Sequence, residues 1–167
     1  MKLPLFPLQY TCYPGETVPL HIFEPRYKQL INDCKDEAIT FGIPVYINDG
    51  MQYGVEVQLV EVVTSYESGA MDVVCVARQV FKLISFEKQL VDKLYSGGVV
   101  ELLAYDYKAD ETFKVEVLGK IRALYAIMEV PFSEAIVAKF NSFTLAHKMG
   151  LSFEQEYALL QIPEEMN

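Results

Sequence analysis

Few residues in this 167-residue chain have the type and spacing needed for acid–base, nucleophilic or metal chemistry. The two histidines, His21 and His147, are isolated, and neither belongs to an HExxH motif or a Cys/His cluster. His21 alternates with apolar neighbours on a short predicted strand, which favours a surface position over a role as general base. The three cysteines are scattered, so no disulfide framework or CxxC metal pair can be drawn from Cys12, Cys34 and Cys75. We therefore predict no catalytic residue, no metal site and no cofactor.

Glu24 and Arg26 are the most conspicuous charged pair. One interpretation is a binding or catalytic pair. The other is structural: Glu24 lies where the positive end of a helix favours an anion, and Arg26 bonds neighbouring carbonyls or a carboxylate. The structural interpretation is favoured because no second acid, nucleophile or metal ligand lies in the same block. We therefore interpret Glu24, Pro25, Arg26 and Tyr27 as a structural motif, with Tyr27 buried.

The elements around this block can be read from prolines and apolar spacing. Pro4 and Pro7 interrupt the first apolar run, so we expect an edge or bulged strand there, not a central one. Residues 13–16 form a predicted turn and residues 18–23 a second strand. Pro25 suits the first turn of a helix. One face of that helix is apolar at positions i, i+3, i+4 and i+7, namely Tyr27, Leu30, Ile31 and Cys34.

The same order of residues resembles the N-terminal domain of Lon proteases. The matching motifs are PLFPL at residues 4–8, PG at 14–15, PL followed by IFEPRY at 19–27, and FG at 41–42. The resemblance implies an α+β fold: a PUA-like β-barrel with one inserted helix, followed by a C-terminal helical segment. It also implies a domain that recognises protein substrates for a protease. We expect the barrel at residues 1–108 and the helical part of the same domain at 109–167.

The next part of the chain alternates with period two, as strands do. Val55, Val57 and Leu59 face one way, and Ser68-Gly69 marks a turn before a β-branched run at residues 72–86. Residues 96–98 precede a further strand at 99–105. A closed sheet needs bulges or glycines where strands bend, and Gly42 and Gly54 are the candidates.

After Asp110, a plausible N-cap, the apolar period becomes helical. A first helix is expected to end at Pro131; its stripe comprises Val117, Leu118, Ile121, Leu124, Tyr125 and Met128. Ser133 is expected to cap a second helix that stops at Gly150. Residues 152–155 have the spacing of a capping box and should open a third helix that ends before Pro163.

Composition limits the class of partner. At 51% hydrophobic residues the chain can bury a sizeable core. The chain has 14 basic and 23 acidic residues, and its formal net charge of −9 disfavours nucleic-acid and anionic-membrane partners. The sequence contains no signal-peptide core and no apolar run of membrane-spanning length. The cytoplasm is the expected compartment.

Three classes of function remain open. The first is a stand-alone, Lon-type recognition domain that binds a protein or peptide client, alone or with a protease system. The chain has no P-loop and no Ser-Lys protease motif, so the resemblance implies recognition without ATP hydrolysis or proteolysis. Candidate binding elements are Tyr10 and Tyr13, expected at the surface, and an unpaired strand edge. The second is a PUA-like RNA-binding module, which the acidic composition opposes. The third is an enzyme with an unrecognised pocket. The client, the oligomeric state and any continuation of the chain beyond Asn167 stay open.

Overall fold

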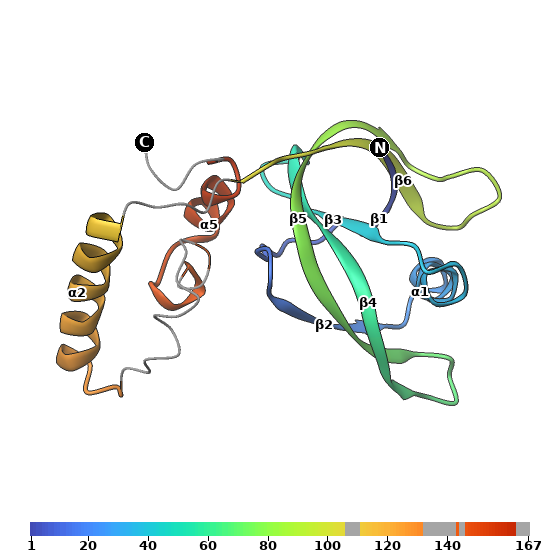
Figure 1. Cartoon of the computed structure of the whole chain (residues 1–167). Coiled ribbons are helices and arrows are strands. Elements are labelled where there is room, and N and C mark those ends of the chain that lie inside the picture. Colours follow the sequence, from blue (N-terminus) through green and yellow to red (C-terminus); the bar gives the residue numbers. More distant parts are fainter. Residues whose placement is uncertain (106–110, 132–142, 144–145, 163–167) are drawn as a thin grey trace.

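The computed structural model describes residues 1–105, 111–131, 143 and 146–162 (Figure 1). Six strands and three α-helices make up the described part, which confirms the predicted α+β class. In chain order the elements are β1 (Lys2–Leu5), β2 (Thr17–Ile22), α1 (Pro25–Glu37), β3 (Phe41–Pro44), β4 (Tyr53–Ser65), β5 (Met71–Glu87), β6 (Ser96–Leu102), α2 (Glu111–Ile127), the short 3-10 helix η1 (Ala146–Lys148) and α5 (Phe153–Leu159).

The six strands form one mixed sheet whose pairings close a ring. The strand order is β2-β5-β4-β3-β1-β6, and a further pairing of β5 with β6 joins the two sides. The long strand β5 makes this possible because its first half pairs with β2 and its second half with β6, while β4 runs along its other edge. Of the strand pairs in the described part of the chain, β1–β3 is parallel and the other five are antiparallel. Strand β2 is therefore an additional strand outside the ring.

Strand β1 is not the edge strand that its prolines predict. It lies between β3 and β6 and pairs with both. Met1 and Val100 exchange two backbone hydrogen bonds, of 2.6 and 2.7 Å. In an antiparallel pair every second residue bonds the partner strand, so the residues of β1 that bond β6 are odd-numbered and the nitrogen of Pro4 points away from β6. On the other side the register with β3 starts only at Leu5, opposite Gly42. The missing N–H of Pro4 thus removes no sheet hydrogen bond.

Two glycines mark close approaches within the sheet, at the positions the sequence indicated. A Cβ atom on Gly54 would lie 2.4 Å from the carbonyl oxygen of Ile43, and one on Gly42 would lie 2.8 Å from side-chain atoms of Leu5 and Phe81. Bulges supply further bending, since β4 and β5 shift register at three places. The glycines at 97 and 98 lie inside β6 instead of preceding a strand.

Helix α1 forms as its sequence predicts. Pro25 occupies the first turn, and the buried residues are Tyr27, Leu30, Ile31 and Cys34. This face joins the main core together with side chains of β2, β3, β4 and β5. Ala38 ends the helix in the left-handed conformation, with φ of 53°.

The C-terminal helices agree with the prediction in part. Helix α2 starts at Glu111, and its stripe is buried at Leu118 and Ile121 but exposed at Leu124 and Met128. The predicted caps Asp110 and Ser133 lie outside the described residues. The capping box is confirmed: Ser152 and Gln155 bond each other's backbone at the start of α5. None of the described helices is long and apolar enough to cross a membrane.

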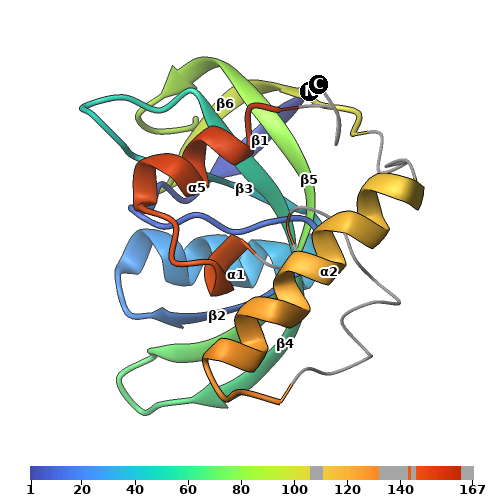
Figure 2. The same ribbon diagram turned by 90° about the vertical axis from the view of Figure 1, so that its left-hand side faces the viewer.

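The described C-terminal segment packs against one side of the ring (Figure 1). Figures 1 and 2 show α5 next to the strands and α2 farther out. Phe143, Ala146 and Leu160 belong to the same core cluster as α1 and the strands. The backbone N–H of Tyr53 donates to the hydroxyl of Tyr157 at 3.3 Å. The sheet and the described C-terminal segment therefore share one hydrophobic core.

Candidate protein-binding surface

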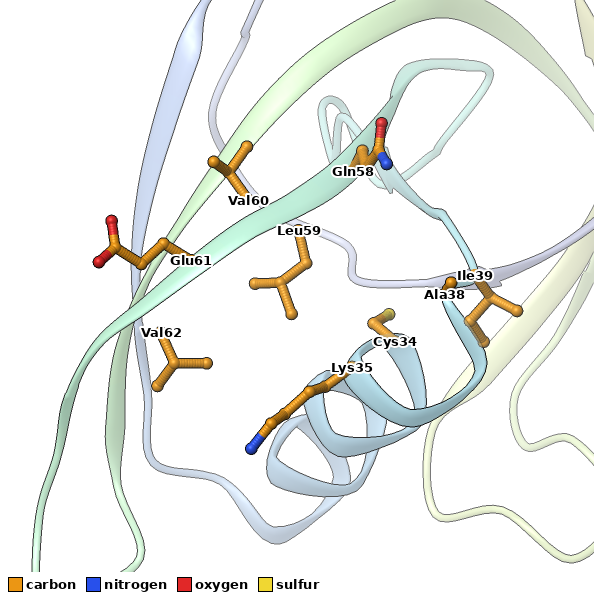
Figure 3. Close-up of a pocket in the computed structure, with 9 residues that line it drawn as sticks. All are labelled: Cys34, Lys35, Ala38, Ile39, Gln58, Leu59, Val60, Glu61 and Val62. Atoms are coloured by element: carbon orange, nitrogen blue, oxygen red, sulfur yellow. The ribbon is translucent and has the colours of Figure 1, made fainter.

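A groove of about 500 Å³ lies between the C-terminal end of α1 and the middle of β4 (Figure 3). Cys34, Ala38 and Ile39 form one wall, and Leu59 and Val62 point towards them from the strand. Lys35 and Glu61, both exposed, add opposite charges to its rim. The groove therefore combines an apolar floor with a charged margin.

The groove exists because β3 is much shorter than β4. The register of β3 on β4 ends where Phe41 faces Val57. The left-handed turn at Ala38 directs the preceding chain into α1, so no strand continues beside β4. The hydroxyl of Thr40 donates to Glu56 at 2.7 Å and fixes the point at which β3 begins.

Residues 58–65 of β4 consequently have a free backbone edge. They pair with β5 on one side. Among the described residues, no backbone–backbone hydrogen bond reaches this stretch from any segment other than β5. A free edge of this kind presents N–H and C=O groups to any chain that runs alongside it.

Two exposed valines make this stretch of β4 more apolar at its surface. Val60 and Val63 are the extra residues of β4 at two of the register shifts, and they are 62% and 57% exposed. Val60 faces outward with Gln58 in the regular alternation of β4, whereas Val63 faces outward because the register shift after Leu59 reverses that alternation.

A second exposed cluster surrounds Asp72 on β5. Its carboxylate accepts from Nδ1 of His21 at 2.6 Å and from the hydroxyl of Tyr66. These two hydrogen bonds lower the pKa of Asp72. Phe23, 62% exposed, stacks on His21 with ring centroids 5.9 Å apart. The predicted surface position of His21 is confirmed, and His21 forms an exposed aromatic patch with Phe23 and Tyr66.

Val63 adds an exposed side chain of β4 to the surroundings of this aromatic cluster. It lines a shallow hollow of about 450 Å³ together with Pro19 and His21. We call residues 23, 60, 63 and 66 the apolar band. Period-two alternation places Val60 on the outer face with Gln58, but it would turn Val63 inward, and the register shift after Leu59 reverses the side of Val63.

The structure separates the two tyrosines that the sequence grouped as surface residues. Tyr10 is exposed, but Tyr13 is completely buried, so its predicted surface position is wrong. The Tyr13 hydroxyl donates to the carbonyl of Glu156 at 2.9 Å, and its ring stacks on Phe143 at 5.0 Å. Both partners come from the far end of the chain, which local turn signals cannot indicate. Cys12 is also buried, and burial raises the pKa of its thiol to about 12.

His147 connects the C-terminal segment to the turn after Tyr13. Its Nδ1 lies 2.8 Å from Glu156 and its Nε2 lies 3.3 Å from Glu16. Burial lowers the pKa of His147, but the hydrogen bond to Glu156 and the two negative charges raise it more, so the net direction is upward. The described residues contain no group of three side chains able to hold a metal ion. We call the contact of His147 with Glu16 and Glu156 the His147 clasp; it joins the described C-terminal segment to the N-terminal part of the chain.

The Glu24–Tyr27 block joins β2 to α1. The carboxylate of Glu24 accepts a hydrogen bond from Nε of Arg26 at 2.8 Å and forms an ion pair with Nη2 at the same distance; Arg26 is exposed and Glu24 is half-buried. The Arg26 guanidinium lies 4.5 Å from the ring centre of Tyr27, and this buried ring lies 3.8 Å from that of Phe6. Burial of Tyr27 is confirmed. Arg26 bonds a neighbouring carboxylate, which is consistent with the structural interpretation of the block.

Comparison with known proteins points to one family. A family model described as the ATP-dependent protease La (LON) substrate-binding domain matches residues 2–164. The crystal structure of a Lon N-terminal domain protein from Xanthomonas campestris is similar, with a TM-score of 0.72, 25% identity, and 99% of this chain and 92% of that chain covered. The N-terminal domain of the Mycobacterium avium complex Lon protease shares the fold, with a TM-score of 0.68, 16% identity and the same coverage. No curated protein sequence matched. The chain belongs to the Lon substrate-binding domain family.

Proposed function

We propose that this chain is a non-catalytic module that binds unfolded or extended segments of other proteins. The observation that carries the proposal is the family match, which extends over residues 2–164 and concerns a substrate-binding domain. The surface supports it, because the groove and the apolar band leave apolar side chains open to solvent on a protein with a large core. Contiguous exposed apolar surface typically marks a site of protein interaction.

Two finer features belong to the same proposal. The ring of strands corresponds to the PUA-like β-barrel that the resemblance implies, with residues 1–108 as its unit and 109–167 as the helical part. The protein works in the cytoplasm and binds without hydrolysing ATP or peptide bonds. The absence of a P-loop from the sequence supports binding without ATP hydrolysis.

A peptide array tests the proposal. Overlapping peptides that cover one aggregation-prone protein are fixed on a membrane and probed with the labelled chain. We expect binding to a subset of peptides rich in aromatic and aliphatic residues, because the exposed surface is apolar. Uniform failure to bind, or binding that follows the basic charge of the peptides alone, would count against the proposal.

A further inference from the structure

We propose that the β4 groove binds an extended segment of a partner polypeptide by strand addition, so that the segment continues the position of β3 along β4. The inference rests on the proposed function and deepens it by naming the site and the conformation of the bound segment. Strand addition combines backbone hydrogen bonds with pockets for alternate side chains.

The backbone geometry supplies the first argument. The N–H of Val45 donates to the carbonyl of Tyr53 at 2.9 Å, and the pairing of β3 continues to Val57. The alternation of an antiparallel pair therefore directs the backbone groups of residues 53, 55 and 57 towards β3. The next residue in this series, Leu59, directs its N–H and C=O to the side where β3 is absent. An incoming extended chain would meet donors and acceptors there that no backbone group of the described residues pairs with.

The side chains supply the second argument. Leu59 and Val62 form an apolar wall opposite Cys34, and Ile39 closes the end of the groove nearest β3. A volume of about 500 Å³ accommodates a few side chains but not a folded domain. The exposed ammonium of Lys35 and carboxylate of Glu61 leave the rim polar. The groove is thus suited to a short segment with apolar residues at alternate positions.

The bulge at Val60 limits the regular pairing to a short stretch. Bulges on open edges also hinder edge-to-edge association of folded proteins, which favours a flexible segment over the rigid edge of a second copy. The length of the free edge and the apolar floor together indicate an unfolded or terminal segment as the occupant.

Hydrogen exchange and a charge substitution test this site. The probe is reduced, carboxymethylated α-lactalbumin, labelled with a fluorophore, and its affinity is measured by anisotropy. Val60→Glu places a carboxylate on the edge at an exposed position, so folding is expected to be preserved. Val91→Glu, at an 85% exposed position between β5 and β6, is the matched control. We expect Val60→Glu to weaken binding about tenfold or more and the control to bind normally. We also expect slower amide exchange in residues 58–65 when the probe is bound.

Other results of these experiments would show whether the proposed binding site, the proposed function or both are wrong. Normal binding by Val60→Glu, with protection confined to other segments, overturns strand addition at β4 but leaves the proposed function intact. No binding of the probe to the unmodified chain overturns both. A concentration-dependent dimer in sedimentation, abolished by Val60→Glu and not by the control, makes a second copy the occupant and also overturns the proposal. Circular dichroism confirms that both variants are folded.

Discussion

At the scale of single residues, the aromatic side chains divide sharply between core and surface. Tyr27 is 5% exposed and Tyr13 is completely buried, whereas Phe23 projects into solvent beside His21. The buried tyrosines connect elements that are distant in sequence. Phe23 lies in the apolar band, where it is available to a partner.

This division predicts different costs of truncation. Tyr27→Ala and Tyr13→Ala should each lower the free energy of unfolding by ~3–5 kcal/mol, because each empties a packed site in the core. Phe23→Ala, the exposed control, should change it by less than ~0.5 kcal/mol. Urea unfolding followed by circular dichroism measures all three. A Tyr13→Ala protein as stable as the Phe23→Ala control would contradict the observed packing of residue 13.

Burial of Tyr27 could be predicted from the sequence, whereas burial of Tyr13 could not. Tyr27 begins a helical stripe whose spacing alone defines a buried face. Tyr13 follows no such pattern, since it lies in a loop beside a Pro-Gly turn. Its burial depends on Phe143 and Glu156, and long-range packing of that kind leaves no local signal.

At the scale of elements, close contacts between strands explain two of the glycines. Gly54 on β4 lies against the backbone of β3, and alanine there would bring its Cβ within 2.4 Å of a carbonyl oxygen. Backbone atoms on a paired strand cannot move away without breaking the register. The contact therefore restricts residue 54 to glycine.

Gly54→Ala is expected to destabilise the fold by more than ~1–3 kcal/mol, the usual cost of overpacking, because the clash is with backbone. Gly119→Ala is the matched control. Apart from the backbone of α2 itself, no heavy atom of the described residues lies within 4 Å of a Cβ added at Gly119, so alanine should stabilise the helix by ~0.5–1 kcal/mol. Thermal melting distinguishes the two. Equal melting temperatures for Gly54→Ala and the unmodified chain would show that the strands are not in such close contact.

The His147 clasp gives the contact between sheet and C-terminal segment a pH dependence. Its groups are His147, Glu16 and Glu156, with Tyr10 and Tyr13 beside the ring. The pKa of His147 is raised in the folded state. Its stabilising contribution is therefore complete below the unfolded-state pKa of about 6.5 and is lost as pH rises through the higher folded-state value.

His147→Gln should remove that contribution. The variant should therefore have a lower unfolding free energy than the unmodified chain, and the difference should be largest at about pH 6 and smallest at about pH 8.5. Urea titrations at several pH values measure the difference. The exposed His21→Gln variant provides the comparison for the other histidine. A deficit for His147→Gln that stays constant across this range would show that the clasp does not depend on the histidine charge.

Element order was more predictable than element neighbours. The prolines, the period-two runs and the capping box indicated the strands, α1 and α5 close to where they lie. The central position of β1 was not predicted, because a proline argues against it unless the register spares its nitrogen. The free edge of β4 also escaped prediction in detail, since it depends on where β3 ends in space.

At the scale of the whole molecule, charge limits the class of partner. A net charge of −9 with 14 basic residues provides little for a phosphate backbone. We expect RNA and DNA to bind with a Kd weaker than about 1 µM at physiological salt, as measured by filter binding over a salt series. Tighter binding with a steep salt dependence would support the alternative that the chain is an RNA-binding module.

The binding of unfolded polypeptide by the complete chain is the central claim, and one titration tests it most directly. Native α-lactalbumin and its reduced, carboxymethylated form share one amino-acid sequence, but the second carries an added carboxylate on each cysteine and exposes apolar segments that the native fold buries. Calorimetric titration of each into the chain, without ATP, should give saturable heat with a negative heat-capacity change for the unfolded form only. Equal binding of both forms, or of neither, would contradict the account.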